Sequence, residues 1–318
     1  MEYIKGITYG AFAGAGSFAK KQAYLSLDKL IECTGANYIV LVPNGLQDTP
    51  QSQEIDYTSP ASLKDDELKK MIGHIKSRGL KVALKPTVNC KNGTWRAHIC
   101  FFDRDVPCEP KWSVWFKAYT DFQLHYARLA EETDVDMFIA GCEMVQSEHR
   151  EDEWRKVISD IREVYSGPVT YNTDKYQEDN VNWWDCVDMI CSSGYYPVND
   201  WDTQLDRIEK VVKKFDKPFF FAEAGCKSTK GSMYLPNDWT LRGDAAPDEQ
   251  ALWYDTMFRA CDKRDFVNGF FLWDWSLKLY SHREASLDKG YDIYGKPAEQ
   301  VIRDHYMSIP RKAHPESC

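Results

Sequence analysis

Two glutamates stand at the ends of apolar segments, where an isolated carboxylate is unfavourable. Glu223 follows an apolar run in PFFFAEAG (218–225), and Glu143 comes near the end of DMFIAGCEM (136–144). A buried carboxylate must be paired or hydrogen-bonded, whereas one that projects into a water-filled cleft avoids much of the desolvation. Each glutamate therefore either forms a structural salt bridge with a buried cation or faces a cleft, and position alone leaves both alternatives open.

Short apolar segments alternate with amphipathic helical patterns along the chain. Eight segments have the length and composition of buried strands: 6–12, 36–43, 81–88, 136–144, 167–172, 188–196, 217–225 and 267–275. Apolar residues between them recur at helical spacing, as at Leu68, Met71, Ile72 and Ile75, and residues 111–133 form a longer helical pattern. Strands that alternate with helices imply parallel strands joined by crossover helices.

Eight strand–helix units predict a single-domain (β/α)8 TIM barrel over residues 1–318, with a core over about 5–305 and a loose tail over 309–318. A doubly wound open sheet is the alternative. Against it, the glycine-rich stretch GAFAGAGSF (10–18) after the first strand lacks the GxGxxG spacing of a dinucleotide site. We therefore interpret these glycines as a close-packed loop.

The composition narrows the class of partner. The formal net charge is −9 and no basic run occurs, which argues against nucleic acid and is compatible with a neutral ligand. Aromatic residues make up 14% of the chain, with 11 Trp and 18 Tyr, and their flat faces suit sugars, although most of them are expected in the core. No apolar run approaches the length of a membrane span, so we expect no membrane partner.

The cysteines and histidines carry no disulfide or metal signature. The ten cysteines include no CxxC pair, and the N-terminal MEYIKGITYG has no apolar signal region. Reduced thiols and a cytoplasmic location are the simpler prediction, unless a signal was trimmed. The seven His residues form no HxH or HExxH pattern, and neither a GxSxG elbow nor a Walker loop occurs, so we expect no metal and no cofactor.

The predicted barrel gives the two glutamates a common location. Glu143 ends the fourth predicted strand and Glu223 the seventh, and the carboxyl ends of barrel strands form one active face. Two glutamates that face each other over a pocket supply the needs of a retaining glycosidase. One ionised carboxylate attacks the anomeric carbon, while the other donates a proton to the leaving oxygen and then activates water.

Several longer stretches resemble glycoside hydrolase family 113, which is known for β-1,4-mannanases. They are AGCEM, VTYNTDKYQEDNVNWWD, SSGYYP, FFFAEAGC, PNDWTLRG and FLWDW, and the similarity covers roughly residues 5–305. The resemblance implies that Glu143 is the acid/base, Glu223 is the nucleophile, and the substrate is β-mannan or manno-oligosaccharides cut by an endo-mannanase. The alternatives are an exo-β-mannosidase, another β-glycanase of the same clan of (β/α)8 retaining glycosidases, and a non-catalytic sugar-binding barrel.

One position departs from the pattern of the wider clan. The clan usually has Asn before the acid/base, where it holds the 2-hydroxyl of the sugar, but this chain has Cys142. A thiol is a poor hydrogen-bond donor. Either another group takes over this contact or the axial 2-hydroxyl of mannose is held differently.

Other residues at the strand ends are predicted to support the site. By the resemblance, a tyrosine after the sixth strand holds the nucleophile, with Tyr196 favoured over Tyr195, and Trp273 forms the floor of the sugar site. Asn172 ends the fifth strand and could bind sugar hydroxyls, while Lys85 could bind a hydroxyl or neutralise a carboxylate. Further sugar contacts are predicted for residues at or beyond the strand ends: Asn89, Trp95, Arg96, Trp201 and Trp239.

Overall fold

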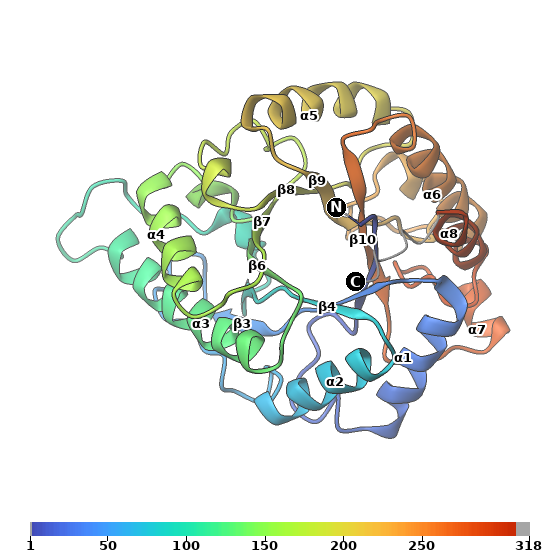
Figure 1. Ribbon diagram of the computed structural model, residues 1–318, viewed down its shortest axis with the longest axis horizontal. Helices are drawn as coiled ribbons and strands as arrows, with labels where there is room; N and C mark the ends of the chain where they lie inside the picture. Colours follow the sequence, from blue (N-terminus) through green and yellow to red (C-terminus); the bar gives the residue numbers. More distant parts are fainter. Residues whose placement is uncertain (1, 310–318) are drawn as a thin grey trace, which may run out of the picture.

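A computed structural model describes residues 2–309, in which eight parallel strands close into a barrel (Figure 1). The strands follow one another around the barrel in chain order: β1 (Ile4–Tyr9), β2 (Tyr38–Leu41), β4 (Lys81–Leu84), β6 (Met137–Cys142), β7 (Val169–Thr173), β8 (Met189–Ser193), β9 (Phe219–Ala224) and β10 (Val267–Trp275). Each of the eight predicted strand segments overlaps one of these strands, although β1 begins two residues earlier and β7 ends one residue later than predicted, so the predicted (β/α)8 barrel is confirmed. The predicted loose tail lies, apart from Ile309, outside the described residues.

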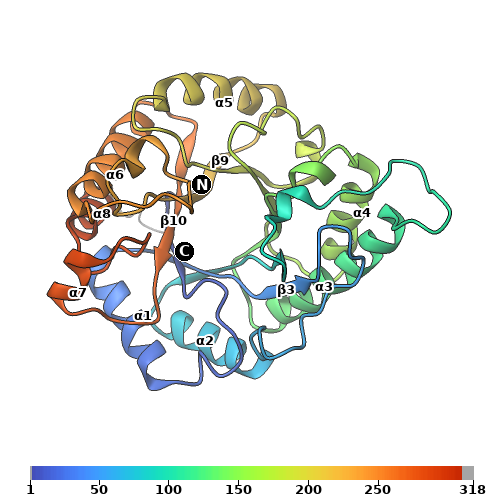
Figure 2. The same cartoon turned by 180° about the vertical axis from the view of Figure 1, so that it is seen from behind.

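Helices form a ring around the barrel, as Figures 1 and 2 show from opposite sides. They are α1 (Lys21–Thr34), α2 (Asp65–Ser77), α3 (Trp112–Glu132), α4 (Glu151–Arg162), α5 (Trp201–Phe215), α6 (Pro247–Cys261), α7 (His282–Leu287) and α8 (Pro297–Ser308). The loops of the described part of the chain contain four 3₁₀ turns: η1 (Arg96–His98), η2 (Val145–Ser147), η3 (Trp184–Cys186) and η4 (Ser232–Tyr234). None of the helices in residues 2–309 is both long and apolar enough to cross a membrane.

Helix α4 shows why these segments fold as they do. Trp154, Val157, Ile158 and Ile161 recur at helical spacing, and all four are buried. Its first turn is acidic, which favours the positive end of the helix dipole. Burial of this apolar stripe against the barrel wall supplies most of the stability of such a helix.

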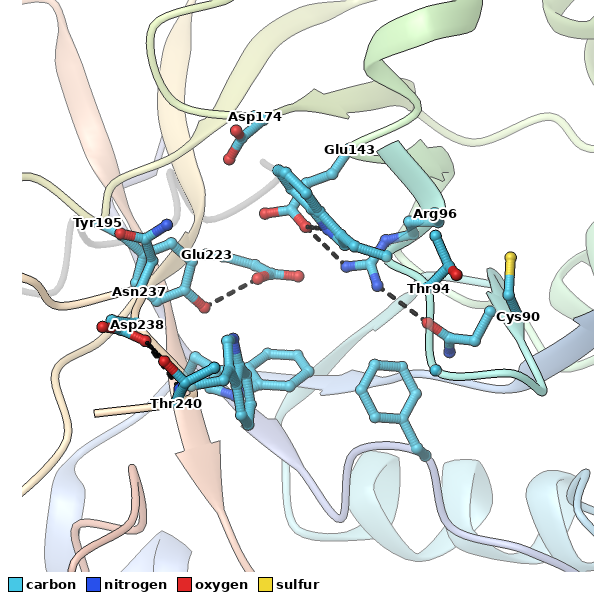
Figure 3. A pocket seen from close by; sticks show the side chains of 16 residues that line it. Cys90, Thr94, Arg96, Glu143, Asp174, Tyr195, Glu223, Asn237, Asp238 and Thr240 are labelled. Carbon is cyan, nitrogen blue, oxygen red and sulfur yellow. Dashed lines mark hydrogen bonds and ion pairs between the residues drawn. The ribbon is translucent and has the colours of Figure 1, made fainter. Parts of the chain in front are cut away.

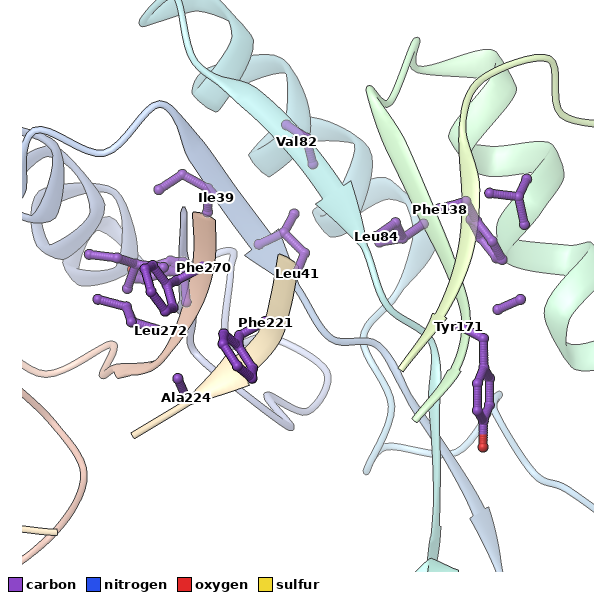
Figure 4. Packing of buried hydrophobic residues seen from close by; sticks show 14 of the residues in the cluster. Ile39, Leu41, Val82, Leu84, Phe138, Tyr171, Phe221, Ala224, Phe270 and Leu272 are labelled. Atoms are coloured by element: carbon purple, nitrogen blue, oxygen red, sulfur yellow. The ribbon is translucent and has the colours of Figure 1, made fainter. Parts of the chain in front are cut away.

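The core has two layers, because successive strand residues point to opposite faces of the barrel wall. One layer lies between the strands and the helices and includes Ile39, Leu41 and Leu84 (Figure 4). The other fills the barrel interior and includes Val40 and Ala83. Both faces of each strand are therefore buried, which explains the nearly continuous apolar segments of the sequence.

A two-stranded ribbon, β3 (Asn44–Gln47) with β5 (Thr87–Cys90), extends from the barrel and was not predicted. The sequence segment 81–88 was assigned to one strand, but β4 ends at Leu84 and β5 begins only after Pro86. Pro43 separates β2 from β3 in the same way. Proline cannot donate to a ladder, so each of the two adjacent strands breaks there and resumes as the ribbon.

Candidate active site

Irregular strand pairing directs both glutamates into the barrel. Ser192 pairs with Phe221 and Ser193 with Glu223, so one extra residue of β9 is accommodated at this step. Such a bulge reverses the alternation of side chains, and Glu223 therefore points inward. A similar shift occurs between β6 and β7, and Glu143 directly after β6 has a left-handed backbone with φ of 54°. Left-handed backbone is uncommon outside glycine and is often found at functional sites.

The carboxyl group of Glu223 is enclosed by three donors. Lys85 forms a salt bridge with Oε1, Cys142 donates its thiol to the same oxygen at 3.2 Å, and Tyr195 donates its hydroxyl to Oε2 at 2.9 Å. Burial raises the pKa of Glu223, but the charges of Lys85 and Arg96 outweigh burial, and the pKa falls below its ordinary value. Glu223 is thus held ionised, as a nucleophile must be.

The carboxyl group of Glu143 also accepts three hydrogen bonds. Trp95 donates Nε1 to Oε2 at 3.1 Å, and Arg96 donates Nη2 to the same oxygen at 2.8 Å. Ser193 donates its hydroxyl to Oε1 at 2.8 Å and accepts a hydrogen bond from Nδ2 of Asn172 at 3.0 Å. Each glutamate is therefore held by its own buried cation and by further donors.

The two carboxyl groups lie side by side in a cleft of about 740 Å³ (Figure 3). One oxygen of Glu143 lies within 4.8 Å of one oxygen of Glu223. A separation of about 5–5.5 Å is typical of retaining glycosidases, whereas inverting enzymes need about 6.5–9.5 Å to admit a water. The short separation favours direct attack by Glu223.

A metal ion does not fit this cluster well. The thiol of Cys142 and the two carboxylates lie within 4.8 Å of one another, a spacing that a metal could use. However, Lys85 and Arg96 already form salt bridges with the two carboxylates. Burial also raises the pKa of the Cys142 thiol, whereas a metal ligand must be a thiolate. The charges favour a neutral ligand in the cleft.

Several predicted contact residues line the cleft beside the two glutamates. They are Asn89, Trp95, Arg96, Tyr195, Trp239 and Trp273. Trp95 and Trp239 are 41% and 60% exposed, so their rings have free faces for a sugar. Lys85 does not line the cleft; it is buried in the salt bridge with Glu223, as the second of its two predicted alternatives requires.

The preference for Tyr196 was wrong, because the two tyrosines point in opposite directions. Tyr195 lies in the inner core layer and donates to Glu223, whereas Tyr196 lies in the outer layer and donates to Glu178 at 2.6 Å. Neighbouring residues near a strand end face opposite sides of the wall. The sequence does not reveal which of the two faces inward, because the bulges change the alternation.

Two other predicted sugar contacts are not at the cleft. Trp201 begins α5, is 2% exposed and packs edge-on against Tyr196 and Phe221, so it is a core residue. Asn172 is fully buried and donates to the backbone of Thr173 and to Ser193. It lies behind Ser193 and orients that hydroxyl.

Sequence reasoning missed Asp174 and Ser193. Asp174 follows β7, lines the cleft and is almost fully buried. Burial and, after it, the nearby charge of Glu143 raise the pKa of Asp174 to about 8. The only signal for Asp174 was its place directly after the fifth strand, in YNTD.

Tyr195→Phe is expected to lower kcat/KM by about 10- to 100-fold, because a hydrogen bond to a charged group contributes about 1.5–3 kcal/mol. Tyr196→Phe is the matched control, since its hydroxyl serves Glu178 outside the cleft. That variant should unfold at a lower temperature but keep kcat/KM within about threefold of wild type. Steady-state kinetics and thermal unfolding of both variants test this, and equal kinetic losses would contradict the placement of Tyr195.

Lys85→Met is expected to move the acid limb of the kcat/KM profile to higher pH. Activity falls as the pH drops through the pKa of Glu223, because the protonated carboxyl cannot attack. Without Lys85, the effect of burial on Glu223 is less well opposed, and its pKa is expected to rise. A limb at the wild-type pH would contradict the role of Lys85; the limb position does not depend on the fraction of folded protein.

Comparisons with known proteins agree with this geometry. The model of glycoside hydrolase family 113 matches residues 7–296. One solved structure, described as a family 113 β-1,4-mannanase, is 53% identical with a TM-score of 0.96, over 97% of this chain and 100% of that chain. A family 113 β-mannanase from Alicyclobacillus acidocaldarius is 39% identical with a TM-score of 0.93, over 97% and 98%. No curated protein matches the chain.

More distant structures share only the fold. A β-glucuronidase from Ruminococcus gnavus is 13% identical with a TM-score of 0.63, over 96% of this chain and 50% of that chain. The family match, in contrast, runs from within β1 to beyond β10 and includes both glutamates. The resemblance noted in the sequence is thereby confirmed, and the chain belongs to glycoside hydrolase family 113.

Proposed function

We propose that this enzyme is a retaining endo-β-1,4-mannanase that acts on β-mannan or manno-oligosaccharides. The observation that carries the reaction type is the pair of facing carboxyl groups, with oxygens of Glu143 and Glu223 within 4.8 Å. The observation that supports mannan as substrate is 53% identity, over 97% of the chain, to a structure described as a β-1,4-mannanase.

The first step forms a covalent glycosyl-enzyme. An oxygen of the Glu223 carboxylate attacks the anomeric carbon, and the bond from this carbon to the leaving oxygen breaks. Glu143 transfers its proton to that oxygen, so the leaving sugar departs as a neutral alcohol. Lys85, Tyr195 and Cys142 hold the attacking carboxylate in place.

The second step releases the product. Glu143, now ionised, removes a proton from water, and the water oxygen attacks the anomeric carbon and displaces Glu223. Two inversions at the same carbon give net retention. Trp95 and Trp239 line the cleft with exposed ring faces, and neighbouring sugar rings would stack on these faces.

Incubation with β-1,4-linked manno-, gluco- and xylo-hexaose tests the substrate class. Cleavage of the manno-hexaose alone is expected, with early products of mixed length. Mannose and the pentamer as sole early products would instead indicate an exo-mannosidase, and cleavage of gluco- or xylo-hexaose would overturn the mannan assignment. Proton NMR of the first product should show the β-anomer; the α-anomer would contradict retention.

A further inference from the structure

A chain of hydrogen bonds connects Glu143 to the ribbon outside the barrel. Arg96 is 7% exposed, and its guanidinium donates Nε to the carbonyl of Cys142 at 2.9 Å, Nη1 to Oδ1 of Asn89 at 3.0 Å, and Nη2 to Oε2 of Glu143 at 2.8 Å. Asn89 in turn donates Nδ2 to Oδ1 of Asn44 at 2.8 Å. Asn44 and Asn89 lie on the two strands of the ribbon, β3 and β5. Figure 3 shows the contact of Arg96 with Glu143.

Each hydrogen bond in this chain has a fixed donor and a fixed acceptor. Arg96 has only donor groups, so Asn89 must present its carbonyl oxygen to Arg96 and its amide nitrogen to Asn44. All three nitrogens of the Arg96 guanidinium donate hydrogen bonds from one rigid plane, and Nη2 also contacts the sulfur of Cys142 at 3.3 Å, which fixes the position of the group. The ribbon thus acts as a support for Arg96.

Glu143 needs external support because it lies just beyond the end of β6, in left-handed backbone. Its Oε2 accepts from Trp95 and Arg96, neither of which can accept a proton in return. Its Oε1 faces the hydroxyl of Ser193, which can both donate and accept. The proton that Glu143 carries in the first step therefore belongs on Oε1.

We propose that Arg96 is a positioning residue for the acid/base: the β3–β5 ribbon holds its guanidinium, which holds Oε2 of Glu143 and leaves Oε1 to transfer the proton. This inference rests on the proposed glycosidase function. It differs from the sugar contact predicted for Arg96 from the sequence. Arg96 acts through Glu143, so its loss should impair proton donation more than attack by Glu223.

A series of aryl β-manno-oligosaccharides with leaving groups of increasing pKa separates these effects. All members place an aryl group at the same position, so loss of a sugar contact affects them alike. Arg96→Met is expected to lower kcat/KM by about 100-fold for the phenyl substrate, which needs proton donation, and by less than about threefold for the dinitrophenyl substrate, which does not. Parallel losses along the series would overturn the inference.

Arg96 also lowers the pKa of Glu223, so each kcat/KM is taken from the plateau of a complete pH profile. Arg207→Met is the matched control, because Arg207 pairs with the buried Glu178 away from the cleft. It should lower the unfolding temperature without any dependence on the leaving group. A leaving-group dependence as steep as that of Arg96→Met would show that the effect is a general result of lost stability, and would overturn the inference.

Asn89→Ala removes the support of the ribbon for Arg96 while Arg96 keeps its charge. This variant also replaces Arg96→Met in the test if Arg96→Met does not fold. The same leaving-group pattern is expected with a smaller loss, about 3- to 10-fold for the phenyl substrate. No loss, or an equal loss for all substrates, would overturn the role of the ribbon. If the wild-type enzyme itself cleaves no mannoside, the proposed function fails instead, so the two failures are distinguishable.

Discussion

Glu223→Gln is expected to lower kcat on manno-oligosaccharides by at least about 10⁴-fold, the scale of loss on removal of a catalytic nucleophile. The amide has nearly the shape of the carboxyl group but lacks its negative charge, so it cannot attack the anomeric carbon. The substitution leaves Lys85 buried without its counter-ion, and we therefore expect a lower unfolding temperature but a folded barrel. Product analysis and thermal unfolding of the same preparation test both expectations.

Glu178→Gln is a matched control for this variant. Glu178 is also a fully buried glutamate with a salt bridge, to Arg207, but it does not line the cleft. Its substitution should lower stability by a similar amount and leave kcat almost unchanged. A Glu223→Gln enzyme that keeps a tenth of wild-type turnover would remove Glu223 from the role of nucleophile.

The sequence predicted the fold and the location of the two glutamates correctly wherever a local pattern of residues is typical of a single structure. Eight apolar segments predicted eight strands, and polar residues at their ends predicted the face of the site. Glu143 and Glu223 were found because a carboxyl group is unusual at the end of an apolar segment. Their two interpretations, salt bridge or cleft residue, were posed as alternatives, but each glutamate pairs with a buried cation and also lines the cleft.

The sequence failed where the answer depended on alternation or on distant contacts. Bulges change which strand residues face inward, so the choice between Tyr195 and Tyr196 needed the register of the sheet. The partnership of Arg96 with Glu143 joins residues 47 positions apart. It also depends on a ribbon whose strands resume after prolines, and no periodic pattern in so short a segment predicts such a contact.

The site divides its charges in a way that suits the two roles. Two cations accompany two carboxylates, so the cluster is close to neutral when both glutamates are ionised. Lys85 is buried directly against the nucleophile and favours its ionised form. Arg96 lies next to Glu143, and its charge also reaches Glu223. When the first step removes the negative charge of Glu223, both cations remain in the cluster with the carboxyl group of Glu143, which acts as the base of the second step.

Glu143→Ala is expected to lower kcat/KM on manno-oligosaccharides by about 10²- to 10⁴-fold, the usual contribution of general acid catalysis. For a dinitrophenyl β-manno-oligosaccharide, kcat/KM should stay close to wild type, because this leaving group departs without a proton. Its kcat should still fall, since water attacks the glycosyl-enzyme slowly without a base. Steady-state kinetics on both substrates measure the two effects.

Azide gives this variant a decisive readout. Azide is anionic, needs no base, and can enter the space left by the side chain, so it should attack the glycosyl-enzyme and raise kcat of Glu143→Ala on the dinitrophenyl substrate. The product should be a β-mannosyl azide, because attack on the covalent intermediate inverts the same carbon a second time. Wild type and Glu223→Gln should show no such rescue. An α-azide, or a loss that is equal for both substrates and insensitive to azide, would exclude Glu143 as the acid/base.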